Sequence, residues 1–107
     1  MTGNQAGQPK LPAALARKRI NQLSKMTANV IFGSHARQRM VEREIFADDV
    51  YRVLRTGYVD GEPELTEQGE WKCKVTLKLQ NGRVAGVVTI ILHKNKLFVK
   101  TVEWEDV

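Results

Sequence analysis

Residues 34–43, with the sequence SHARQRMVER, hold the side chains of this chain that are best suited to chemistry. In a helix, at about 100° per residue, His35, Arg39 and Arg43 fall within one narrow stripe. An imidazole can give or take a proton near neutral pH, and guanidinium groups bind phosphate oxygens through paired N–H donors. The stripe therefore predicts a site that meets a phosphodiester.

The motifs that the sequence lacks limit the expected chemistry to a reaction without a metal or cofactor. The sequence has no glycine-rich phosphate loop, serine nucleophile elbow, zinc-protease motif or zinc-type Cys/His spacing. Its acidic residues cluster in a predicted loop over residues 60–70 and at the C-terminus, away from the basic elements. RNA carries its own nucleophile, the ribose 2′-OH, so a protein need only move protons and stabilise negative charge. The same residues suit binding without cleavage almost as well.

Positive charge is concentrated in the N-terminal part of the chain. Seven Lys or Arg residues precede the first acidic residue, Glu42, whereas the rest of the chain has ten basic and twelve acidic residues. The net charge of +5 therefore comes from the N-terminal part and points to an anionic partner, with RNA as the leading expectation. These basic residues could equally form a solvated surface. The candidate nucleic-acid contacts are Arg17, Lys18, Arg19, Arg37, Lys74 and Lys78.

Length and composition predict one cytoplasmic domain. A chain of 107 residues, 42% of them hydrophobic, can build a single modest core. One cysteine excludes an internal disulfide, no apolar run approaches the roughly 20 residues of a membrane span, and no signal-peptide pattern is present. We expect residues 1–10 to be disordered and residues 11–107 to form the domain.

Helical patterns fill the first half of this domain. Residues 11–26 predict a basic helical extension that begins near Pro12. A short apolar link, which could be a small strand, leads into the helix that carries the stripe. Asp48 and Asp49 favour the start of a third helix, and Gly57 is a natural stop for it.

Strand patterns follow the helices. Residues 71–80 alternate between an apolar row that includes Cys73, which we assign to the core, and a lysine row. Asn81-Gly82 predicts a hairpin, and two further strands follow over residues 84–92 and 97–104. We expect an α+β fold, with two or three N-terminal helices packed on one face of a three- to four-stranded antiparallel sheet. The lysine row, Lys72, Lys74 and Lys78, is expected on the other face.

Two parts of the sequence carry a resemblance to a known family: the run Phe32-x-Ser34-His35-Ala36-Arg37-x-Arg39-Met40-x-Glu42-Arg43, and a closing strand that contains Thr101 and Trp104. The chain resembles an uncharacterised bacterial family of small domains with a HARxRMxER helix motif (DUF4258-like). The resemblance covers roughly residues 30–104, and this family is similar to the RelE/ParE-like toxins and ribonucleases. It implies a RelE-like fold, a metal-independent endoribonuclease activity and a role in a toxin–antitoxin pair, with an antitoxin or another acidic protein as partner. The active-site positions that it implies are His35, Arg39, Arg43, Lys72 and Thr101. A non-catalytic nucleic-acid-binding protein and a phage- or toxin-associated protein-interaction module are the alternatives.

Overall fold

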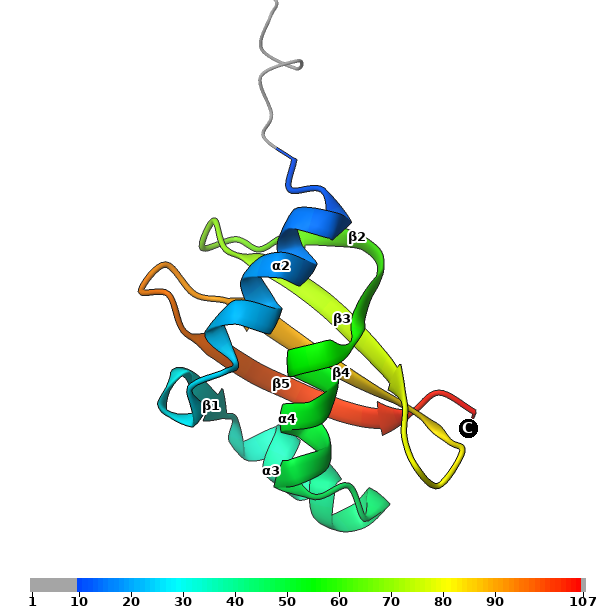
Figure 1. The fold of residues 1–107 in the computed structure, drawn as a ribbon. Coiled ribbons are helices and arrows are strands. Elements are labelled where there is room, and N and C mark those ends of the chain that lie inside the picture. Colours follow the sequence, from blue (N-terminus) through cyan, green and yellow to red (C-terminus); the bar gives the residue numbers. More distant parts are fainter. Residues whose placement is uncertain (1–9, 107) are drawn as a thin grey trace, which may run out of the picture.

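The structure, a computed structural model, describes residues 10–106, and its helices precede most of its strands (Figure 1). The elements are α2 (Ala13–Leu23), the 3-10 turn η1 (Thr27–Asn29), β1 (Val30–Phe32), α3 (Ser34–Arg43), α4 (Ala47–Thr56), β2 (Tyr58–Leu65), β3 (Trp71–Lys78), β4 (Val84–Ile91) and β5 (Leu97–Trp104). The predicted α+β class is therefore confirmed. The expectation of disorder over residues 1–10 lies, apart from Lys10, outside the described residues.

The sheet is larger than predicted and is mixed. Its five strands lie in the order β1-β5-β4-β3-β2, and β2 to β5 form an antiparallel meander. The short strand β1 joins the edge in parallel with β5, with Val30 opposite Leu97. The prediction of three to four strands, all antiparallel, is wrong. Three residues are too few to show a strand period, and a parallel partner far along the chain leaves no turn signal in the sequence.

The first part of the predicted acidic loop is in fact the edge strand β2. Gly61 has a positive φ of 78°, and the register with β3 shifts between Asp60 and Glu64, so the pairing is irregular there. Gly61 and Pro63 resemble turn residues in the sequence. An edge strand tolerates both, because one side of its backbone has no partner strand. The loop prediction is therefore wrong for residues 60–65.

Two helices cover one face of the sheet, as predicted, whereas the third helix lies along its edge. α2 and α4 pack on the strands through fully buried side chains, and α3 contacts β5 (Figure 1). Cys73 is buried among the strand residues of this core, and burial raises the pKa of its thiol to about 11. It therefore stays protonated and packs as a core residue, as the alternation predicted. Lys72 and Lys74 alternate with the buried residues of β3 and point to the uncovered face. Lys78, the last residue of the strand, instead lines a groove beside α4.

Candidate functional site

The three stripe residues lie on α3, but two of them already have partners within the protein. His35 is exposed in the first turn of the helix. Arg39 forms an ion pair with Glu42, with 2.6 Å between Nη1 and Oε1, and this contact lowers the pKa of Glu42. Arg43 donates a hydrogen bond from Nη1 to the backbone oxygen of Val102 at 3.1 Å. The stripe therefore presents less free positive charge than its sequence predicts.

Lys72 does not join this stripe. It lies on β3, where its ammonium group is 3.3 Å from the carboxylate of Glu64, and β4 and β5 separate it from α3. At about 4.8 Å per strand, Lys72 is roughly 10 Å from the backbone of β5 and farther from α3. Thr101 is on β5, opposite Val88, next to the helix that carries the stripe. The structure therefore brings Thr101 to the side of α3 but leaves Lys72 two strands away.

The lysine that does lie near α3 is Lys74, in a cluster with two carboxylates. Its Nζ is 3.0 Å from Glu103 and 2.6 Å from Glu105. These three residues line a cavity of about 320 Å³ together with Arg43 and Trp104. The cluster contradicts our expectation that the C-terminal acids lie away from the basic elements. Glu103 and Glu105 were not predicted as site residues, although the alternation of the last strand places Glu103 on the lysine face.

The positive charge of Lys74 is fully compensated within this cluster, which has two carboxylates for one cation. The hydrogen bond from Lys74 lowers the pKa of Glu103, and contact with Glu105 is the largest effect that raises the pKa of Lys74. A cation bound by two carboxylates has little capacity left for a phosphate. We therefore assign this cluster to the stability of the sheet face and not to substrate binding.

The cluster predicts a stability difference that depends on pH. We expect Lys74→Met to lower the free energy of unfolding at pH 7 by about 1 kcal/mol, because the ion pairs are partly exposed. Since Glu103 has a lowered pKa in the folded state, its contribution is present above the ordinary value of 4.5 and is lost as the pH falls through the folded value. Urea unfolding of both proteins at pH 7 and at about pH 3 should show the difference shrink. Lys78→Met, in the same lysine row, should show no such trend, and an equal loss for Lys74→Met at both pH values would contradict the prediction.

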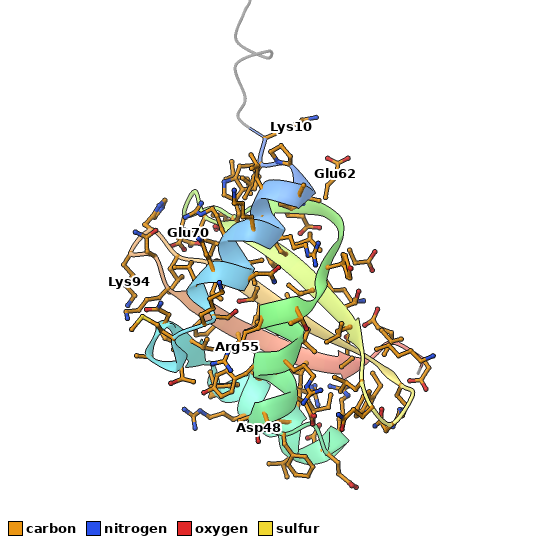
Figure 2. The ribbon with its side chains drawn as sticks, viewed as in Figure 1. Lys10, Asp48, Arg55, Glu62, Glu70 and Lys94 are labelled. Atoms are coloured by element: carbon orange, nitrogen blue, oxygen red, sulfur yellow. The ribbon has the colours of Figure 1, made fainter. Side chains whose placement is uncertain are left out.

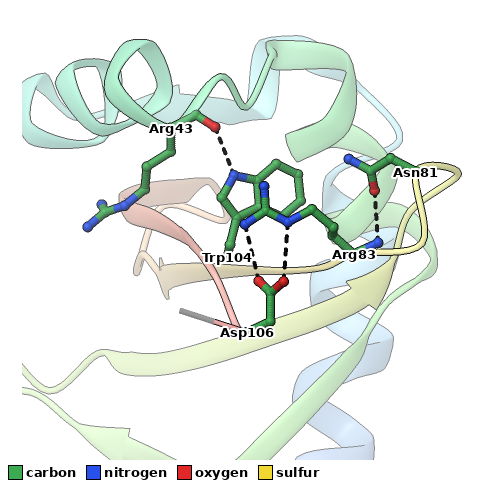
Figure 3. Close-up of polar contacts among 5 residues, drawn as sticks. All are labelled: Arg43, Asn81, Arg83, Trp104 and Asp106. Carbon is green, nitrogen blue, oxygen red and sulfur yellow. Dashed lines mark hydrogen bonds and ion pairs between the residues drawn. The ribbon is translucent and has the colours of Figure 1, made fainter.

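The end of β5 is joined to α3 by Trp104 (Figure 3). Its indole Nε1 donates a hydrogen bond of 2.8 Å to the backbone oxygen of Arg43. Arg83 stacks on the indole, 4.2 Å from the ring centre, and forms two hydrogen bonds with the carboxylate of Asp106. Trp104 is buried, so these contacts assign it and the backbone of Arg43 to the fold.

The predicted nucleic-acid contacts on α2 differ in whether other parts of the protein already bind their side chains. Arg17 stacks on Tyr58 at 3.8 Å and donates a hydrogen bond of 2.9 Å to the backbone oxygen of Gly57, so it attaches α2 to the start of β2. Lys18 is exposed, and Arg19 reaches Asn95 in the turn before β5 at 3.5 Å. Lys18 and Arg19 therefore remain accessible to an anion, whereas Arg17 has a structural role.

A groove between α4 and the end of β3 gathers basic side chains from separate elements. Arg52, Arg55 and Lys78 line this basic groove, which has a volume of about 590 Å³, together with Tyr51 and Asp48. Figure 2 shows Arg55 and Asp48, both from α4. Within residues 10–106, the side-chain ion pairs within 4.0 Å involve other cations, so none of these three groups is neutralised by a close carboxylate. The basic groove therefore gathers positive charge that no close carboxylate neutralises.

Arg55 is held by contacts of the same kind as those of Arg17, so Arg52 and Lys78 supply the accessible charge of the basic groove. The Nε of Arg55 donates a hydrogen bond of 2.7 Å to the backbone oxygen of Ser24, and its Nη2 lies 3.5 Å from that of Lys25. The guanidinium group also stacks on Tyr51, 5.0 Å from the ring centre. It thereby satisfies carbonyls at the C-terminal end of α2, where the helix dipole favours a cation. Lys25, whose backbone oxygen Arg55 approaches, is exposed.

Sequence reasoning did not select Arg52 or Arg55 as site residues. Both lie near the C-terminal end of α4, three positions apart, where a basic residue is explained by the helix dipole alone. Lys78 was predicted, but only as part of the lysine row. The meeting of α4 with the end of β3 depends on how the helix packs on the sheet, which no local pattern encodes.

Comparison with protein families places the chain among known domains. Residues 32–104 match the family described as "Domain of unknown function (DUF4258)". The chain belongs to this family. The match covers α3, α4 and strands β2 to β5, so the DUF4258 domain contains Arg52, Arg55 and Lys78 but not α2. No curated protein and no solved structure gives a match to the chain.

Residues 10–106 offer neither a metal site nor a membrane-spanning helix. In this part of the chain, no group of three or more His, Cys, Asp or Glu side chains is arranged to hold a metal ion. None of the helices described there has the length and apolar character needed to cross a membrane.

Proposed function

We propose that this DUF4258 protein binds single-stranded RNA through the basic groove. The observation that carries the proposal is the meeting of three cations without a close carboxylate, Arg52, Arg55 and Lys78, at a groove of about 590 Å³. Proteins that bind single strands combine a positive groove with aromatic rings on which bases stack. Tyr51 lines the same groove, where Arg55 stacks on its ring.

The contacts favour binding over cleavage. Of the three residues that the ribonuclease hypothesis assigns to the scissile phosphate, Arg39 and Lys72 each have a carboxylate partner, and Arg43 donates a hydrogen bond to the backbone of Val102. His35 is exposed on α3, and the basic groove is lined by α4 and the end of β3. We also propose that the family is distantly related to the RelE/ParE toxins, that the fold is RelE-like and that the protein acts in a toxin–antitoxin pair. The order of helices before a largely antiparallel sheet supports these proposals.

The groove residues are expected to determine both affinity and its dependence on salt. We expect Arg52→Gln/Lys78→Gln to weaken binding of a labelled RNA of about 20 nucleotides by about tenfold and to reduce the slope of log K against log salt by about 1.4, because two phosphate contacts are lost. Fluorescence anisotropy at several salt concentrations measures both quantities. A purely structural effect would not change the slope by this amount.

A matched variant separates the groove from net charge. Lys10→Gln/Lys100→Gln removes the same number of charges from exposed positions that do not line the basic groove, and Lys10 lies at the opposite end of α2 from Arg55 (Figure 2). Its affinity should stay within about twofold of the starting protein. No RNA binding by the starting protein, or equal losses in the two variants, would refute the proposal.

The same samples distinguish binding from catalysis. The RNA should remain intact during incubation with the protein in EDTA. If the starting protein cuts RNA and His35→Ala does not, the metal-independent endoribonuclease hypothesis replaces the binding proposal. DNA of the same sequence serves as the comparison, and RNA should bind more tightly because the 2′-OH is available for recognition.

A further inference from the structure

A second groove, between α3 and α4, is apolar and open to solvent. Its volume is about 510 Å³, and it is lined mainly by apolar side chains that include Met40 and Ile45. Val41 is 80% exposed and Phe46 is 68% exposed, and both line this groove. Adjacent exposed side chains of this kind mark an interaction surface more often than isolated ones do.

The charges at the rim of the apolar groove have a specific order. Arg37 and Val41 lie one turn apart on α3, and Glu44 caps the C-terminal end of this helix with a positive φ of 55°. All three line the apolar groove, so a cation and an anion flank an exposed apolar residue. Along the helix axis, the backbone of Glu44 lies about 10 Å from that of Arg37. Arg37 is held there by its Nε, which donates a hydrogen bond of 3.3 Å to the backbone oxygen of Phe32. Within residues 10–106, neither Arg37 nor Glu44 belongs to an ion pair.

We propose that a second copy of this chain docks on the apolar groove, with the two α3 helices antiparallel about a two-fold axis near Val41. In such an interface each residue meets its counterpart in reverse order. Arg37 then faces Glu44 of the partner subunit, and Glu44 faces the partner subunit's Arg37, while the exposed apolar side chains meet at the centre. The order cation, apolar residue, anion is thus complementary to itself, which is the argument for a second copy over an unrelated partner.

Charge reversal gives a test that is specific to this pairing. In a dimer of Arg37→Glu, an acidic residue would face another acidic residue at both contact points across the interface. In a dimer of Glu44→Arg, a basic residue would face another basic residue at both points. Each variant alone should dimerise at least about tenfold more weakly than the starting protein. An equimolar mixture of the two should recover dimerisation, because both pairs across the heterodimer interface are then opposite in sign. Arg37→Glu/Glu44→Arg should recover it as well.

Sedimentation velocity over about 1–200 µM protein measures these equilibria. Val41→Asp serves as the second probe, because a charge at the centre of the interface should abolish the dimer. Circular dichroism checks that each variant is folded. Because the mixture contains the same two variant proteins that are measured singly, recovery of dimerisation in it cannot come from a change in their stability. A starting protein that remains monomeric, single variants that dimerise normally, or a mixture without recovery would overturn the proposal. In the first case the groove is left to a different protein. None of these outcomes depends on RNA binding.

Discussion

Trp104→Ala is expected to lower the free energy of unfolding by about 3–5 kcal/mol, the range for removal of a large buried aromatic side chain. Trp104 is only 8% exposed, and it packs the end of β5 against α3. Its indole also satisfies a backbone group: Arg43 is the last residue of α3, and its carbonyl has no partner within the helix. Because domains of this size have only about 5–15 kcal/mol of stability, the loss would be a large fraction of the total. Urea unfolding measures it.

Trp104→Phe separates the two contributions of this residue. Phenylalanine keeps most of the apolar surface but cannot donate to the carbonyl of Arg43, so we expect a loss of about 1–2 kcal/mol. The free energy of unfolding should decrease from the starting protein to Trp104→Phe and further to Trp104→Ala. The m-value should stay constant, since the extent of the folded core is unchanged. Equal losses for the two variants would show that the hydrogen bond, and not packing, accounts for the effect.

Local sequence patterns predicted the elements better than their assembly. The hairpin at Asn81-Gly82, the core position of Cys73 and the end of α4 before Gly57 all follow from signals within a few residues. The parallel pairing of β1 with β5 and the continuation of β2 past Gly61 do not, because the first depends on a distant partner and the second on an edge position. A pattern of side chains specifies which residues can form a strand, but not which strand lies beside it.

The candidate site shows the same limit more strongly. His35, Arg39 and Arg43 do share one helix, as the spacing predicted, yet the charge of Arg39 is already paired with that of Glu42. The basic groove uses Arg52 and Arg55, which look ordinary in the sequence. Free charge is a property of the folded surface. It depends on which carboxylates the fold brings within reach, and counting basic residues along the chain cannot supply that.

Gly57 is the position at which three elements meet, and Gly57→Ala should cost about 3 kcal/mol of stability. A Cβ atom there would overlap the backbone oxygen of Val53 and lie 2.7 Å from that of Thr76. Both obstacles are backbone atoms of regular elements, so neither can move without shifting α4 or β3. The shift would also disturb the hydrogen bond from Arg17 that attaches α2, so the loss should appear as a lower urea midpoint.

Gly86→Ala is the matched control, because its obstacles are flexible. A Cβ atom at Gly86 would meet the carboxylate end of Glu105 and the Cε of Lys74, the latter at 3.0 Å. Long side chains at a partly exposed sheet face can swing aside, so we expect a loss below about 1 kcal/mol, mainly from a weaker Lys74–Glu105 pair. The pair of variants therefore compares the same added methyl group against backbone and against side chains. A loss at Gly57 no larger than that at Gly86 would mean that α4 can move on the sheet, and the basic groove between them would then have no fixed shape.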